Sequence, residues 1–193
     1  VETTGLRSDV MSVHLWSAAL RVHQGEHGAA LTHLDAAERD LRSALGSPQE
    51  FTFHLYAAVA RALGSQGRPT LERRSLLRAA RGSADTLRKF AKSSPQNFGH
   101  HVALADACVA AAEGGGAAKP FDEALRLATG GGFTRDAALT AFLAARHLLA
   151  AGESRAAAQF LADARVQHAR WGADGVTPRL EELARDLRAA GVE

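Results

Sequence analysis

The stretch Ser93–Gly116, SSPQNFGHHVALADACVAAAEGGG, carries the residue types best suited to chemistry. It places two adjacent histidines, His100 and His101, an aspartate, Asp106, and the chain's single cysteine, Cys108, within a dozen residues. Imidazole, carboxylate and thiol groups are those used for nucleophilic catalysis and for metal binding. The first question is whether the segment is an active site, a metal site or the beginning of a helix.

Local signals favour the helix. Ser94 is a suitable N-cap, Pro95 suits the first helical position, and Asn97 lies three residues beyond the cap. From there apolar residues recur at helical spacing: Phe98, Val102, Ala105, Cys108 with Val109, and Ala112. Cys108 is therefore predicted to be a small buried hydrophobe in the middle of a helix, too far from His101 to form a thiolate pair. We expect no catalytic residue here.

The nine histidines raise the possibility of a metal site. His23 and His27 are four residues apart, but Gly25 between them indicates a helix end. The neighbours His100 and His101 should point about 100° apart on a helix, which is a poor arrangement for joint ligation. We therefore expect hydrogen-bonded or solvated histidines, with no metal site and no cofactor.

The amino-acid composition limits which class of protein the chain can belong to. Alanine and leucine dominate the apolar residues, and both favour helices, so the chain is predicted to be all-α. The formal charge of +2 indicates no particular partner, and one cysteine excludes an internal disulfide. There is neither a signal-peptide pattern nor an apolar run long enough for a membrane span. A cytoplasmic location and no membrane partner are expected.

Short segments rich in Gly, Pro and Ser divide the chain into about nine helices. Connections this short favour antiparallel helix hairpins. We predict one helical-repeat domain over residues 1–193, with hairpins at 9–46, 47–93, 95–130 and 133–172 and a terminal capping helix at 177–190. The apolar stripe of Val13, Trp16 and Leu20 belongs to the first hairpin, and Trp16 and Trp171 are predicted to be core anchors.

The hairpins resemble one another in sequence. Residues 25–38, GEHGAALTHLDAAE, and 152–165, GESRAAAQFLADAR, share Gly, Glu, Ala-Ala, Leu and Ala at matching positions. Small residues followed by a large one suit the close approach of two helices in a stacked repeat. The spacing of about 40 residues exceeds that of a strict tetratricopeptide repeat (TPR), so we expect a TPR-like, right-handed α-α superhelix.

The segment 133–183 resembles the C-terminal helical-repeat region of large bacterial signalling ATPases. These chains join a serine/threonine-kinase-like domain, an AAA-type ATPase module, a TPR-like region and often GAF and histidine-kinase domains. The resemblance extends over roughly residues 10–185 and is most specific at PQNF (95–98) and RWGA (170–173). At 146–150 the chain has RHLLA where the family is richer in aromatic residues. The resemblance implies a non-enzymatic regulatory repeat module, either part of such a chain or free-standing.

The segment 68–92 is strongly basic. It holds eight Lys or Arg residues against two acidic residues, a net charge of +6. The residues that could form a basic face are Arg73, Arg74, Arg78, Arg81 and Arg88. An acidic partner or a nucleic-acid backbone could dock there, whereas a solvated outer helix is the alternative. Interleaved aromatic residues for base stacking are lacking, since Phe90 is isolated.

First helices of TPR-like pairs usually face the concave side, which identifies candidate groove residues: His54, Tyr56, Arg61, His100, Arg146 and His147. Ordinary packing or surface roles are the alternative for each. The function expected is recognition of a protein or peptide partner, or of an adjoining ATPase or sensor domain of the same chain. The second expectation is an accessory domain for nucleic acid or a transcription regulator, using the basic face in 68–92.

Overall fold

The computed structural model describes residues 2–191, with side-chain exposure for residues 7–191. The described residues form helices and connecting turns without a β-strand, so the all-α prediction and its count of about nine helices are confirmed. The α-helices are α1 (Glu2–His23), α2 (His27–Arg39), α3 (Pro48–Leu63), α4 (Thr70–Ser93), α5 (Pro95–Glu113), α6 (Ala118–Gly130), α7 (Thr134–Ala150), α8 (Ser154–Trp171) and α9 (Thr177–Ala189). Two short 3₁₀ helices, Leu41–Ala44 and Asp174–Val176, lie in connections.

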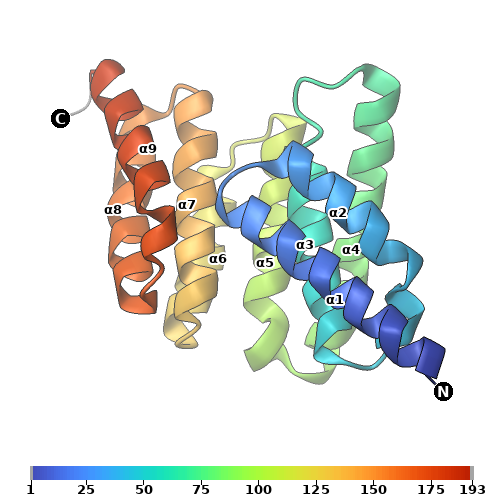
Figure 1. The fold of residues 1–193 in the computed structure, drawn as a ribbon. Coiled ribbons are helices and arrows are strands. Elements are labelled where there is room, and N and C mark those ends of the chain that lie inside the picture. The colour runs from blue at the N-terminus through green and yellow to red at the C-terminus, as the bar shows by residue number, and fades with distance from the viewer. Residues whose placement is uncertain (1, 192–193) are drawn as a thin grey trace. The chain divides into compact units, whose positions relative to one another are not determined.

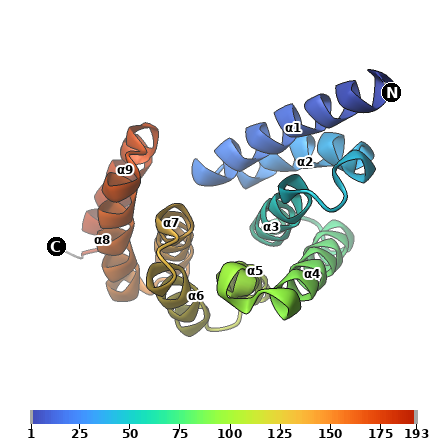
Figure 2. The same cartoon turned by 90° about the horizontal axis from the view of Figure 1, so that it is seen from below.

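The chain divides into two compact units, residues 1–98 and 99–193, with the boundary inside the first turn of α5. In the first unit α1 packs against α2 and α3, and α3 packs against α4 (Figure 1). In the second unit α7 packs against α6, α8 and α9, and α8 packs against α9 (Figure 2). None of the described helices combines the length and the apolar composition that a membrane span requires.

Glycine ends several helices where the sequence indicated breaks. Gly172 adopts φ 73°, a left-handed conformation that permits the chain to leave α8 directly after Trp171. Gly132, at φ 76°, does the same between α6 and α7. The predicted helix end at Trp171–Gly172 is therefore confirmed.

The core of the second unit is built largely from α7. Eleven of its seventeen residues are buried, most of them alanine or leucine. Because alanines leave room, neighbouring helices approach α7 closely on more than one side. This close packing also buries one charged residue of its first turn, Asp136, which is 4% exposed.

Both tryptophans are more exposed than predicted. Trp16 is 50% and Trp171 39% accessible to solvent, so the prediction that they anchor the core is wrong. Val13 and Leu20, which share the predicted stripe with Trp16, are 65% and 57% exposed. The face of α1 that is buried is a different one, formed by Met11, Leu15, Ala18 and Val22. The sequence was ambiguous because α1 is apolar on two faces.

Candidate functional site: a buried His-His-Asp cluster

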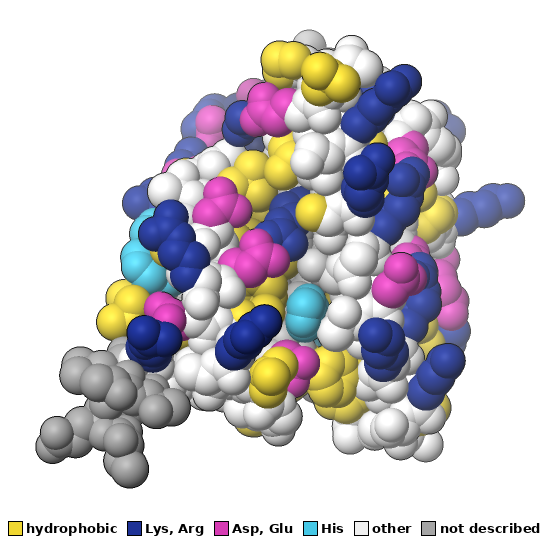
Figure 3. Space-filling model, turned by 90° about the vertical axis from the view of Figure 1, so that its right-hand side faces the viewer, with side chains coloured by type: hydrophobic (Ala, Val, Ile, Leu, Met, Phe, Trp, Pro, Cys, Tyr) yellow, Lys and Arg dark blue, Asp and Glu magenta, His cyan; other side chains and the backbone are white. Residues whose placement is uncertain are grey.

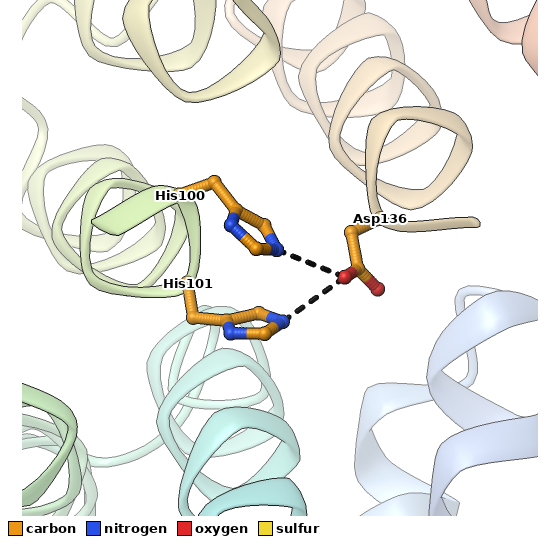
Figure 4. Close-up of side chains that lie close together, drawn as sticks. All are labelled: His100, His101 and Asp136. Atoms are coloured by element: carbon orange, nitrogen blue, oxygen red, sulfur yellow. Dashed lines mark hydrogen bonds and ion pairs between the residues drawn. The ribbon is translucent and has the colours of Figure 1, made fainter. Parts of the chain in front are cut away.

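Three buried polar residues of the second unit converge on one point. His100 and His101 extend from the first turns of α5, and Asp136 extends from the first turn of α7 (Figure 4). The Nε2 atom of each imidazole lies 3.0 Å from the same carboxylate oxygen, Oδ2 of Asp136. Each of the three residues is 4% exposed. The cluster is thus a single hydrogen-bonded group shielded from water.

The expectation that His100 and His101 diverge is wrong. Their ring centroids lie only 3.9 Å apart, with 41° between the ring planes. Successive Cβ atoms on a helix do diverge by about 100°, but rotation about two side-chain torsions lets long rings turn toward a common partner. That partner, Asp136, is 35 residues away from His101 in sequence.

The loop between α6 and α7 supports this geometry. Phe133, directly before α7, stacks on His100 with ring centroids 4.1 Å apart and planes 17° apart. A Cβ atom on Gly131 would lie 2.5 Å from Cε2 and 2.7 Å from Cδ2 of Phe133. Glycine at position 131 is therefore what allows Phe133 to rest against His100.

The carboxylate of Asp136 is held from both sides. Its Oδ1 accepts a hydrogen bond from Nε of Arg135 at 3.0 Å, while Oδ2 faces the two imidazoles. Burial by itself raises the pKa of Asp136, but the hydrogen bonds from His100 and His101 and the Arg135 charge outweigh burial and hold this pKa well below its ordinary value. Burial lowers the pKa of His101, and its hydrogen bond to Asp136 offsets only part of that effect. The cluster therefore combines an ionised carboxylate with a neutral His101 imidazole.

Cys108 lies on the same helix and takes no part in this cluster. The thiol is fully buried, and burial raises its pKa far above the ordinary range. The prediction that Cys108 behaves as a small hydrophobe is supported by both observations. A thiolate nucleophile would need a charged neighbour or a helix N-terminus, and Cys108 sits in the middle of α5.

The candidate groove residues of the first unit are largely buried. Tyr56 is 1% exposed, and its hydroxyl lies 3.2 Å from Nε2 of His23. Arg61 is 7% exposed and forms an ion pair of 2.5 Å with Glu38, which neutralises its buried charge. His54 is half-buried, and burial lowers its pKa.

The other candidates belong to the second unit. Arg146 is exposed, and its guanidinium lies 5.6 Å from the centre of the Phe142 ring. His147 is half-buried, with its ring 6.2 Å from that of Phe121. Of the six candidates, the structure places only His100 in the His-His-Asp cluster. Asp136, its partner there, carried no sequence signal that would have identified it.

The basic residues of α4 lie mostly on its solvent side. Arg74, Arg78, Arg81 and Arg88 are exposed, and Arg73 is half-buried. Arg88 pairs with Asp85 at 2.6 Å. On the side of the molecule that faces the viewer in Figure 3, Lys and Arg side chains are interspersed with Asp and Glu. Phe90, the single aromatic residue of the basic segment, contacts Phe51 and Phe98 in a three-ring cluster.

A small open pocket lies at α8 and the beginning of α9. Its volume is about 250 Å³, and its lining includes His168, Asp174 and Glu181. His168 donates from Nδ1 to the carbonyl of Ala164 at 2.8 Å. Ligand pockets for drug-sized molecules usually hold about 300–1,000 Å³, so this one suits at most a smaller ligand.

No protein-family model, curated protein or solved structure matches the chain.

Proposed function

We propose that the chain is a non-enzymatic helical-repeat module that binds an amphipathic helix of a protein partner on the outer face of α1. The observation that carries this proposal is that α1 has two apolar faces, only one of which is covered. Met11, Leu15 and Val22 on the inner face are fully buried. A helix that is apolar on both sides is normally covered on both.

The outer face of α1 is defined by Val10, Val13, Trp16 and Leu20. These residues are 47–65% exposed, and they recur at intervals of three or four residues. Half of the eight large hydrophobic residues that are exposed in the part of the chain with described side chains lie on this one helix. Their spacing is the one that a helix presents to another helix. Single exposed apolar residues are common on protein surfaces, but a row of four is not.

The size of this face decides what kind of complex it can support. Completing the burial of four half-exposed side chains contributes about 3–6 kcal/mol, taking about 1.5–3 kcal/mol for each full burial. A micromolar complex needs about 8 kcal/mol of net binding free energy after the costs of association. The outer face of α1 is thus a suitable centre for an interface, and the partner must add polar contacts around it.

A regulatory repeat module is also what the sequence resemblance to signalling ATPases implies. In this proposal the partner helix belongs either to another domain of the same chain or to a separate regulator. The nucleic-acid alternative rests on the exposed arginines of α4. It has less support, because Arg68 and Arg88 are already paired with Glu72 and Asp85.

The test is site-specific photo-crosslinking in cells that make the protein naturally. A photoreactive residue at Val13 should give a defined protein adduct, whereas one at Leu71, which is 82% exposed on α4, should not. The adduct is identified, and its affinity for the purified chain is measured by titration. Val13→Glu should weaken binding at least tenfold, and Leu71→Glu should leave it unchanged. Equal labelling at both positions, or unchanged affinity with Val13→Glu, would refute the proposal.

A further inference from the structure

The three residues of the buried cluster provide atoms that could also coordinate a metal ion. Two imidazole nitrogens and one carboxylate oxygen, from His100, His101 and Asp136, all lie within 4.8 Å of one another. Mixed nitrogen and oxygen ligands are typical of Zn²⁺, Co²⁺ and Ni²⁺ sites. Ca²⁺ and Mg²⁺ prefer all-oxygen sites, so the two histidines select against them.

The spacing of these atoms is close to that of a coordinated ion. Each Nε2 atom lies 3.0 Å from Oδ2 of Asp136. In a tetrahedral zinc site with bonds of about 2.1 Å, ligand atoms lie roughly 3.4 Å apart. Each nitrogen–oxygen spacing would have to widen by about 0.4 Å for an ion to lie between the three atoms (Figure 4).

Neighbouring groups already hold two of the three ligands, His100 and Asp136, in place. Phe133 fixes the plane of His100 by stacking, and Arg135 binds Oδ1 of Asp136, which leaves Oδ2 directed at the imidazoles. Metal ligands in proteins are commonly oriented by such a surrounding set of contacts. Folding has thus already ordered the side chains of these two ligands before an ion binds.

We propose that His100, His101 and Asp136 bind one divalent transition-metal ion of the zinc class. The ion joins the first turns of α5 and α7 and stabilises the second unit. The positive charge of Arg135 and the amino-terminal ends of both helices oppose a cation. The affinity is therefore expected to be lower than that of cysteine-rich zinc sites. This site is independent of the outer face of α1.

The experiment uses the full 193-residue chain without an affinity tag, treated with chelator and then titrated with Co²⁺ and with Zn²⁺. Co²⁺ in a site of this kind gives visible d–d absorption bands, and calorimetry gives the stoichiometry for Zn²⁺. We expect one ion per chain and a higher midpoint of thermal unfolding with Zn²⁺. Asp136→Asn, which keeps the shape of the side chain, should weaken binding about 100-fold, since the charged ligand is lost.

A matched control separates this site from adventitious binding by other histidines. His14 and His33 form a pair in the first unit with their Nδ1 atoms 3.3 Å apart. His33→Gln should leave Zn²⁺ affinity unchanged, whereas His101→Gln should lower it. If His101→Gln fails to fold by circular dichroism, the Asp136→Asn titration decides. Absence of saturable binding, equal affinity of Asp136→Asn and the parent chain, or loss of binding in His33→Gln would overturn the proposal.

Discussion

Gly131→Ala should displace Phe133 from His100 and destabilise the second unit. The added Cβ would lie 2.5 Å and 2.7 Å from two carbons of the Phe133 ring, whereas carbon atoms pack at about 3.5–4.0 Å. The ring must therefore move by about 1 Å. Overpacking costs about 1–3 kcal/mol, and loss of ring stacking about 0.5–1.5 kcal/mol. Because the ring of Phe133 is only half-buried, it can move aside and relieve part of this strain. We therefore expect a net loss of about 1–2 kcal/mol in the free energy of unfolding.

The matched control is Gly130→Ala, one residue earlier at the end of α6. No atom lies within 4 Å of the position that its Cβ would take. Removing a glycine where alanine fits stabilises by about 0.4–1 kcal/mol. Urea unfolding followed by circular dichroism compares the two variants, and NMR follows the ring protons of His100, whose shifts depend on Phe133. Equal stability of the two variants with unchanged His100 shifts would refute the role assigned to Gly131.

Three further outcomes are expected. Glu38→Gln should lower the free energy of unfolding by about 1–2 kcal/mol, because it leaves the buried Arg61 cation without its carboxylate. Glu123→Gln, in an exposed ion pair, should have no measurable effect. Urea unfolding compares the two variants, and equal losses of stability would contradict this expectation. Burial lowers the pKa of the His168 imidazole below its ordinary value of 6.5. As pH falls, the unfolded chain therefore protonates this imidazole before the folded chain does. The contribution of neutral His168 to the free energy of unfolding is fully present above pH 6.5 and is lost as pH falls below it. Unfolding titrations at several pH values should show this loss, reduced in His168→Phe. Because the Cys108 thiol is buried, it should not react with a thiol reagent in the folded chain and should react once the chain unfolds. Rapid labelling of Cys108 in the folded chain would contradict the structure.

Features that depend on neighbours in sequence were predictable. The helix beginning at Pro95, the helix end at Trp171 and the burial of Cys108 all follow from local signals and from an apolar stripe within one helix. Each depends on residues within a few turns. The sequence was therefore sufficient for the helical class and for most helix limits.

Features that depend on distant residues were not predictable in the same way. The convergence of His100 and His101 depends on Asp136, whose approach is set by the packing of α7. Helix periodicity fixes where a Cβ points but leaves the side-chain torsions undetermined. The prediction for Trp16 was wrong for a related reason. Helix α1 has two apolar faces, and periodicity alone does not indicate which of them is buried.

The pattern of helix packing has a consequence for how the chain folds. Most of the helix pairs that pack within a unit, such as α1 with α2, α3 with α4, and α7 with α8, are neighbours along the chain. Forming such contacts closes only short loops, so little chain entropy is lost before they stabilise, and folding should be fast. Each hairpin can also form as soon as it leaves the ribosome, before later hairpins are synthesised.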